Sequence, residues 1–344
     1  MKQTADTTPN QSSTSSGKTI RALRFDGDVA KLESNYQLPE PAPGEAVLRT
    51  AKAAVSATDL QICSGLFSFE GTLGHEFVGY VESINGDSQP ELIGKRVVGS
   101  IDAVCGKCDM CMAGLKAHCR DRTVLGRKGR DGCLADALVL PTSNLLAVPD
   151  TVDNDHAVFI HALASAIQVA RQLTIEGRPY ITVLGDGPLG LLTVQVMAKL
   201  NASVRLIGRY SEKLAICEKW GVKHRHIDDI GRRADQDIVV ECTGAPAGLE
   251  LAMQLVRPRG TIVLKTLLAD QSNVITGLDL SPIVINEITL LGSRSGPMSQ
   301  ALAMIERNEI DVVSLIGKRM SLADGPAVLK AASQSGMLKV LVDP

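Results

Sequence analysis

Residues 180–190 read YITVLGDGPLG, an apolar run that ends in three glycines spaced G-x-G-x-x-G. The run YITVL predicts a buried β-strand and the apolar residues that follow predict a helix, so the glycines fall in a strand-to-helix turn. Such a turn lets a pyrophosphate approach the backbone at the helix N-terminus. A glycine-rich turn without a ligand is the alternative, but this position favours a dinucleotide site. Its expected contacts are Gly185, Gly187, Pro188, Leu189 and Gly190.

Strands and helices alternate on both sides of this turn, which predicts right-handed crossovers and a doubly wound parallel sheet of the Rossmann type. Before residue 150 the chain shows short β-rich runs broken by turn residues instead, a pattern typical of an antiparallel barrel. The expected strands of the parallel sheet are 180–184, 203–207, 237–241, 260–265 and 288–291, and the expected helices are 153–173, 191–200, 211–220 and 247–255.

The segment 206–213, LIGRYSEK, contains the end of the second expected strand. Sites for NAD usually place an acidic residue there to hold the ribose hydroxyls. Here the acid is absent, Gly208 makes room, and Arg209 and Lys213 supply positive charge. This arrangement favours the 2′-phosphate of NADP(H) over NAD(H). The alternative is that both cations are solvated at a helix start and NAD still binds.

Four cysteines, Cys105, Cys108, Cys111 and Cys119, follow the spacing C-x2-C-x2-C-x7-C. Four thiolates this close suit one tetrahedral zinc ion. A chance cluster of reduced thiols and a pair of disulfides are the alternatives. A zinc ion with four sulfur ligands has no open coordination position, so this site is expected to be structural, and the reaction must occur elsewhere.

Composition narrows the class of protein further. The 344 residues suffice for two domains, and a net charge of −2 gives no reason to expect nucleic acid or a membrane as partner. No apolar stretch has the length of a membrane span, and no signal peptide is evident. Residues 1–18 are rich in Ser and Thr and are expected to be a disordered tail. The thiolate cluster and the scattered apolar cysteines predict a reducing, cytoplasmic location.

Together these motifs resemble the medium-chain dehydrogenase/reductase superfamily, in its zinc-dependent alcohol dehydrogenase branch. The resemblance covers residues 19–344. It implies a GroES-like antiparallel β-barrel catalytic domain, formed by 19–150 and completed by 292–344, with a Rossmann domain inserted at 151–291. It also implies a small-molecule alcohol or carbonyl substrate and a homo-oligomer, dimer or tetramer. Besides the cysteine run and GDGPLG, it rests on GTLGHEFVGYV (71–81), ECTG (241–244), RPRGTIVL (257–264) and ITLLGSRSG (288–296).

The resemblance also implies a catalytic zinc held by three side chains and an exchangeable water. His75 matches the family's histidine ligand, and His161 falls at the position of the third ligand. Ser56 stands where the family has a cysteine ligand. The complete set of matching positions is Ser56, Thr58 as proton relay, Asp59 as a supporting carboxylate, His75, Glu76 and His161, while Thr243 and Arg294 are expected along the dinucleotide.

Two of the three ligand positions therefore depart from the family pattern. Ser56 is a poor zinc ligand because its neutral hydroxyl lacks the softness of a thiolate. Glu76 can complete a set with two imidazoles if its side chain swings in, since His₂Glu is a known catalytic zinc set. The alternative is a metal-free site in which His75 and His161 are hydrogen-bonded to Glu76 and Ser56.

Three functions remain open on the sequence. The leading interpretation is an oxidoreductase that transfers hydride between NADP(H) and an alcohol or carbonyl compound, with zinc as Lewis acid. The second is a zinc-free carbonyl reductase in which His75, His161 and Thr58 polarise the substrate by hydrogen bonds. The third is a dinucleotide-binding sensor or structural protein that has lost turnover.

Overall fold

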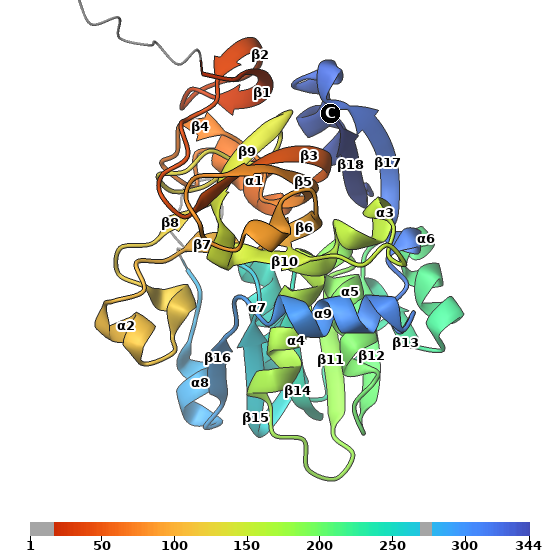
Figure 1. Ribbon diagram of the computed structural model, residues 1–344. Helices are drawn as coiled ribbons and strands as arrows, with labels where there is room; N and C mark the ends of the chain where they lie inside the picture. Colours follow the sequence, from red (N-terminus) through yellow and green to blue (C-terminus); the bar gives the residue numbers. More distant parts are fainter. Residues whose placement is uncertain (1–16, 269–276) are drawn as a thin grey trace, which may run out of the picture.

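The computed structural model describes residues 17–268 and 277–344, so the tail predicted for 1–18 lies, apart from its last two residues, outside the described residues. Figure 1 shows two lobes, an upper lobe of mostly antiparallel strands and a lower lobe built around a parallel sheet. None of the described helices is both long and apolar enough to span a membrane.

The upper lobe combines a three-stranded sheet, in the order β2-β1-β4, with a seven-stranded sheet in the order β10-β6-β5-β3-β18-β17, in which β9 also pairs with β3. Its strands are β1 (Thr19–Phe25), β2 (Ala30–Gln37), β3 (Glu45–Val55), β4 (Gly71–Thr72), β5 (Glu76–Ile84), β6 (Arg96–Gly99), β9 (Ala137–Pro141), β10 (Leu145–Ala147), β17 (Ile316–Ser321) and β18 (Lys339–Asp343). Its helices are α1 (Ala57–Cys63) and α10 (Ala327–Ala332).

Strand β3 lies at the centre of this lobe. Its successive side chains point to opposite faces, so Ala46 and Leu48 pack into one core cluster and Val47 into another. Strand β18 returns from the other end of the chain to pair antiparallel with β3. Its pairing with β17 is parallel, a departure from the all-antiparallel barrel that we predicted.

The cysteine run forms a small projection on this lobe, at the left of Figure 1. It lies between two short paired strands, β7 (Asp102–Ala103) and β8 (Thr123–Val124), and contains helix α2 (Asp109–Met112).

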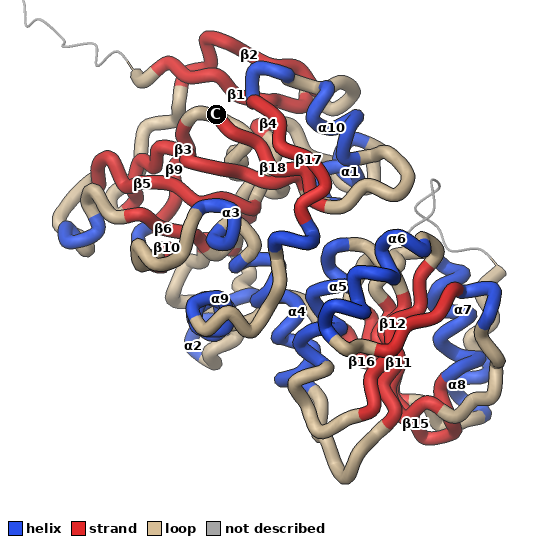
Figure 2. The backbone as a smooth tube through the Cα atoms, turned by 90° about the vertical axis from the view of Figure 1, so that its right-hand side faces the viewer, coloured by secondary structure: helices blue, strands red, loops and turns tan. Residues whose placement is uncertain are grey.

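The lower lobe is a six-stranded, all-parallel sheet in the order β13-β12-β11-β14-β15-β16, the doubly wound topology that the sequence predicts. Figure 2 shows helices on both sides of this sheet. The strands are β11 (Tyr180–Leu184), β12 (Ser203–Gly208), β13 (Lys223–His226), β14 (Gln236–Glu241), β15 (Val256–Leu264) and β16 (Thr289–Gly292), and the helices are α4 (Ile160–Gln172), α5 (Pro188–Met197), α6 (Ser211–Leu214), α7 (Pro246–Leu255), α8 (Ser281–Ile285) and α9 (Met298–Glu306). Helix α3 (Asn154–Ala157), which precedes α4, contacts β3 and β5 of the upper lobe.

Apolar residues cover both faces of the parallel sheet. Ile181 and Val183 of β11 share a core cluster with α4 and α5, while the next residue, Leu184, belongs to the cluster formed with α7. Helix α9 packs on α4 and so links the segment after β16 to the rest of the molecule. The exact domain limits at 150 and 291 stay a prediction.

Candidate functional site

The turn after β11 has the backbone geometry that its glycines predict. Gly185 adopts φ +108°, which favours glycine, and a Cβ at Gly190 would lie 1.9 Å from the carbonyl oxygen of Gly185. At Gly187, the N-cap of α5, an added Cβ would meet nothing within 4 Å. Pro188 starts the helix, where its missing N–H costs nothing, and Leu189 follows. The helix start therefore leaves space for an anion at its positive end.

Asp186, inside this turn, is a residue that our sequence reasoning missed. Its carboxylate is buried, and Oδ2 accepts hydrogen bonds from the backbone N–H groups of Arg209, at 2.7 Å, and Tyr210, at 2.8 Å. A Cβ at Gly208 would lie 2.5 Å from the same oxygen, so glycine is needed there. The acid that is absent at the end of β12 is thus supplied from the neighbouring turn. The sequence signal for this residue was the Asp of GDGPLG, which we treated as one of the variable positions of the G-x-G-x-x-G motif.

The two cations predicted beyond β12 differ in their surroundings. Arg209 is exposed, and its guanidinium makes no hydrogen bond or ion pair with any described residue. Lys213 is buried, with its ammonium nitrogen 4.5 Å from the ring centroid of Tyr210. Arg209 is therefore the exposed charge at this corner, whereas Lys213 is covered by its neighbours.

The end of β14 is organised by Glu241, a fully buried carboxylate in the ECTG motif that we did not single out. Its Oε1 accepts the backbone N–H of Thr243 at 2.6 Å and also the hydroxyl of that residue. Its Oε2 accepts the hydroxyl of Thr266 at 2.9 Å, at the end of the next strand. Glu241 thus fixes two strand ends beside the dinucleotide turn. This places Thr243 at the sheet edge where a dinucleotide contact was predicted.

Lys265 follows β15 and lies at the same end of the parallel sheet, towards the upper lobe. Its buried ammonium donates to the carbonyl oxygens of Ser293, at 3.3 Å, and Arg294. Burial lowers the pKa of Lys265 to about 8. The side chain of Arg294 points to the cysteine projection, donating to Ala117 O at 2.7 Å and to Asp102 Oδ1 at 2.8 Å. Arg294 therefore already has partners, and its predicted contact with the dinucleotide stays a prediction.

The four predicted cysteines converge in a candidate metal site. Their sulfur atoms all lie within 4.8 Å of one another, and Cys119 Sγ is 3.5 Å from Cys105 Sγ and 3.8 Å from Cys108 Sγ. Tetrahedral zinc with Zn–S bonds of about 2.3 Å needs sulfur atoms about 3.8 Å apart. All eight cysteines of the chain are free, so the alternative of disulfides in this run does not match the structure.

Protonation of these thiols also fits a bound cation. Backbone N–H groups of Arg120 and Cys111 lower the pKa of Cys108 to about 6. Burial, with hydrogen bonds from Cys108 and Cys119, raises the pKa of Cys111 to about 12. Four thiolates cannot coexist here unless a metal ion neutralises them. The donor set therefore fits zinc.

At the interdomain site, Ser56 caps helix α1. Its N–H and its hydroxyl both donate to Asp59 Oδ2 at 2.7 Å, and its oxygen accepts the N–H of Asp59. Asp59 is fully buried, and its second oxygen accepts the N–H of Gly74 at 3.0 Å. The Thr58 hydroxyl, in the first turn, makes no hydrogen bond with a described residue. Ser56 thus has a structural role in the cap, and Thr58 is free to act on a substrate.

The two predicted histidines do come together. The rings of His75 and His161 meet edge to face with centroids 5.4 Å apart, and His75 Nδ1 lies 3.9 Å from Asp59 Oδ1. Burial, followed by the charges of His75 and Arg294, lowers the pKa of His161 well below its usual value. At neutral pH His161 is therefore an uncharged imidazole, able to donate one hydrogen bond or to bind a metal.

Glu76 is separated from this pair by its own partner. Its Oε2 accepts from the ammonium of Lys339 at 2.8 Å, and both side chains are only 6% exposed. Lys339, on β18, is 263 residues away in sequence, so nothing local to the G-H-E motif indicated it. The alternative of a metal-free site with hydrogen bonds from Glu76 and Ser56 to the histidines is not what the structure has, since Glu76 binds Lys339 and Ser56 binds Asp59.

As arranged, the interdomain residues do not fit a three-ligand zinc. Among the residues that the structure describes, the cysteine projection is the one place where three or more His, Cys, Asp or Glu ligand atoms converge. His75 and His161 supply two imidazoles, but Ser56 is a poor ligand and Glu76 must leave a buried ion pair to join them.

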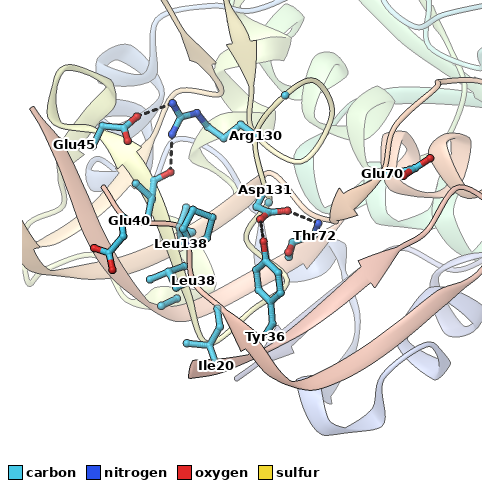
Figure 3. Close-up of a pocket in the computed structure, with 15 residues that line it drawn as sticks. Ile20, Tyr36, Leu38, Glu40, Glu45, Glu70, Thr72, Arg130, Asp131 and Leu138 are labelled. Carbon is cyan, nitrogen blue, oxygen red and sulfur yellow. Dashed lines mark hydrogen bonds and ion pairs between the residues drawn. The ribbon is translucent and has the colours of Figure 1, made fainter. Parts of the chain in front are cut away.

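One cavity of about 330 Å³ lies elsewhere in the upper lobe (Figure 3). Two of its polar groups already have partners: Arg130 donates to Glu45 at 2.6 Å, and Asp131 accepts from Tyr36. None of the predicted site residues lines it. The predicted site residues thus lie apart from this cavity, and a reactive site at the His75–His161 pair stays a prediction.

A parallel sheet with a dinucleotide-type turn, joined to a barrel lobe, with His75 of the upper lobe facing His161 of α4, is the arrangement of a two-domain dehydrogenase. Comparison with known proteins agrees: residues 42–150 match the alcohol dehydrogenase GroES-like domain, and residues 188–307 match the zinc-binding dehydrogenase domain. The chain belongs to the zinc-dependent alcohol dehydrogenase-like branch of the medium-chain dehydrogenase/reductase superfamily.

Individual relatives cover nearly the whole chain. The L-threonine 3-dehydrogenase of Streptomyces avermitilis is 28% identical over 329 residues, covering 89% of this chain and 93% of its own. The sorbitol dehydrogenase of Halalkalibacterium halodurans is 24% identical over 326 residues, covering 89% and 94%. A zinc-binding dehydrogenase of Sinorhizobium meliloti, solved with NADP, is 26% identical with a TM-score of 0.85, covering 95% of this chain and 100% of that one. The protein is accordingly an alcohol dehydrogenase-like oxidoreductase.

Proposed function

We propose that the protein interconverts an alcohol and a carbonyl compound at the His75–His161 pair, with NADP(H) as hydride carrier. The observation that carries this is the continuity between the dinucleotide turn and the two imidazoles. A Cβ at Gly185 would lie 3.0 Å from the carbonyl carbon of Cys242. Further along the same edge, Lys265 donates to Arg294 O, which also accepts, at 3.0 Å, the hydroxyl of Ser165 on α4, the helix of His161. A nicotinamide ring extending from the turn along this edge reaches the histidines.

Hydrogen bonds from His161 and Thr58 can polarise the carbonyl group of the substrate. Uncharged His161 can donate to a carbonyl oxygen, and the unpartnered hydroxyl of Thr58 can pass a proton to or from that oxygen. A catalytic zinc, when bound by His75, His161 and a displaced Glu76, would supply Lewis acidity to the same oxygen. The buried Glu76–Lys339 pair disfavours that displacement, so we propose one tightly held zinc per chain, in the cysteine projection.

The preference for NADP(H) is supported by Arg209 and Lys213, whose charges have no carboxylate partner in the described chain. One observation favours NAD(H) instead: Asp186 occupies the two backbone N–H groups at the end of β12 and brings a negative charge to that corner. Titration of the purified protein with NADPH and NADH, followed by fluorescence, decides between them. We expect the tighter binding for NADPH, and equal or reversed affinities would refute the preference.

Turnover on a panel of alcohols and aldehydes with NADP⁺ and NADPH tests the activity itself. We expect reversible reduction of the cofactor by at least one secondary alcohol, since threonine, sorbitol and related compounds are substrates named for the relatives. Binding of cofactor without turnover of any compound would favour the alternative of a dinucleotide-binding sensor.

We further propose a homo-oligomer in a reducing, cytoplasmic setting. Strand β16 is an edge strand of the parallel sheet, and the adjacent helix α8 exposes Val284 (79%) and Ile285 (76%). An unpaired strand edge beside exposed apolar side chains is a surface suited to a second copy. The eight free cysteines support a reducing compartment.

A further inference from the structure

We propose that the substrate carries an oxyanion, a phosphate or a carboxylate, which Arg127 binds beside the histidine pair. This inference rests on the proposed function, because it names the class of substrate for the same site. It starts from three arginines, Arg122, Arg127 and Arg294. Arg294 and Arg122 lie 2.8 Å and 3.4 Å from Asp102 Oδ1, and the charges of these three groups act on Arg127.

The backbone places this cluster beside the reactive residues. Gly126, which precedes Arg127, packs on the turn before His75, and a Cβ there would lie 2.3 Å from Gly74 O. On the other side, Leu125 N–H donates to Ile101 O at 2.9 Å, next to Asp102. The loop that carries Arg127 is therefore held between the His75 turn and the strand of Asp102.

Asp102 connects the cluster to His161. Both residues line one small cavity of about 30 Å³, together with Ser295 and Gly296. Asp102 is already used, because Arg294 donates to its Oδ1 at 2.8 Å and Arg122 lies 3.4 Å from the same oxygen. It leaves no strong carboxylate partner for a third arginine.

Arg127 is the member without a polar partner. Its guanidinium lies 4.1 Å from the ring centroid of Phe67, and within the described chain it makes no hydrogen bond or ion pair. Burial and then the charge of Arg294 lower its pKa. A partly buried, unpaired guanidinium over an aromatic ring keeps N–H groups for a planar or tetrahedral oxyanion.

The location of Arg127 distinguishes it from the site expected to bind the phosphates of the cofactor. Phe67 follows helix α1, whose first turn holds Ser56 and Thr58, so Arg127 belongs to the upper lobe and to the substrate side. The cofactor pyrophosphate is expected instead at the start of α5, in the lower lobe. An anion at Arg127 is thus a second anion, carried by the substrate.

The test compares matched neutral and anionic polyols in the presence of saturating NADP⁺, which blocks the pyrophosphate site. The probes are sorbitol, sorbitol 6-phosphate and gluconate, so that the two anionic arms distinguish phosphate from carboxylate. We expect kcat/KM to be at least tenfold higher for one anionic probe than for sorbitol. Equal values for all three probes would overturn the proposal.

Variants then assign the effect to one side chain. Arg127→Gln should lower kcat/KM for the preferred anion ten- to a hundredfold, the scale of a charge-assisted hydrogen bond, and change that for sorbitol less than twofold. Arg127→Lys should recover part of the lost kcat/KM, because lysine keeps the positive charge but lacks the paired N–H donors of the planar guanidinium. Arg259→Gln, at a side chain 79% exposed at the opposite end of the sheet, is the matched control and should change nothing. An equal loss for neutral and anionic probes would show a structural role and refute the assignment.

A binding measurement keeps the inference separate from the activity. With NADP⁺ bound, sorbitol 6-phosphate, gluconate or inorganic phosphate should raise the melting temperature of the wild type more than sorbitol does, and Arg127→Gln should abolish the difference. Absence of any such shift refutes the inference, whereas a shift without turnover leaves the anion site standing and refutes the proposed reaction.

Discussion

At the scale of single residues, the zinc content of the proposed reactive centre depends on Ser56. In the structure it caps α1 and binds Asp59, the carboxylate that lies 3.9 Å from His75 Nδ1. Ser56→Cys should raise the zinc content of the purified protein from about one towards two per chain and increase alcohol oxidation, because it restores the missing soft ligand. Metal analysis after mild chelation measures this. Ser64→Cys, on the exposed far end of the same helix, is the control. Two chelation-resistant zinc ions in the wild type, unchanged by the substitution, would contradict the idea.

The cysteine projection gives the second prediction at this scale. Cys108→Ser should release one zinc ion and lower the melting temperature, since metal binding is folding energy in a closed thiolate site. NADPH affinity should be preserved, because the projection lies outside the parallel sheet. Zinc content and thermal denaturation measure the effect, and Cys63→Ser, a partly buried cysteine outside the projection, serves as control. Retention of zinc and of the melting temperature would show that the four-cysteine assignment is mistaken.

The third prediction concerns the corner beyond β12. Arg209→Ala should narrow the preference for NADPH over NADH by about 1–3 kcal/mol, the worth of a charge-assisted hydrogen bond. Asp186→Asn should widen it, because the amide oxygen still accepts the N–H groups of Arg209 and Tyr210 while the negative charge is gone. Dissociation constants for both cofactors measure the change. Asp28→Asn, an exposed site in the upper lobe, should have no effect. If either variant changes the preference for NADPH over NADH in the opposite direction, these charges do not face the 2′ position of the adenosine ribose.

How far single residues could be predicted depends on how local their partners are. The cysteines were found because their spacing alone specifies a tetrahedral site. Glu76 was named as a possible zinc ligand, but its partner Lys339 comes from a distant strand, so the ion pair that holds its side chain was not predicted. Asp186 was missed because its hydrogen bonds reach the neighbouring strand, whereas the motif that contains it specifies only glycines.

At the scale of elements, the glycines in the turn between β11 and α5 have two different roles: Gly190 allows close packing, and Gly187 leaves space for the phosphates. Gly190→Ala should destabilise the fold, because its Cβ would lie 1.9 Å from Gly185 O. Gly187→Ala should fold normally, since nothing lies within 4 Å of its Cβ, yet bind the dinucleotide less well because the methyl group enters the phosphate space. Thermal denaturation and cofactor titration separate the two outcomes. If Gly190→Ala melts like the wild type, the close approach described here is not present in solution.

Most elements of the lower lobe match their prediction because apolar runs and turn signals repeat regularly there. The helix predicted for 153–173 instead breaks into α3 and α4, since Val158 and Phe159 satisfy the helical apolar pattern although the chain turns there. Strand β13, Lys223–His226, was not predicted: it is a polar edge strand with no apolar alternation to indicate it. Pairing with β12, not its own sequence pattern, makes it a strand.

At the scale of the whole molecule, the exposed surface of α8 and β16 predicts self-association. The wild type should elute as a dimer or a larger oligomer, and Val284→Asp should shift the mass towards the monomer, because it places a charge in an apolar contact. Size-exclusion chromatography with light scattering measures the mass. Val29→Asp, 46% exposed between β1 and β2, is the control. A monomeric wild type would refute the prediction.

The Glu76–Lys339 pair has a consequence for biosynthesis. Glu76 opens β5, early in the chain, whereas Lys339 belongs to β18, which the ribosome makes after every other strand of the two lobes. Until β18 emerges, the Glu76 carboxylate lacks its cation and β3 lacks a neighbour. A nascent chain can fold its parallel sheet before then, because domains fold as they are synthesised. The Glu76–Lys339 pair, by contrast, forms only after β18 has been synthesised, so a product truncated before β18 can retain a dinucleotide fold without this pair.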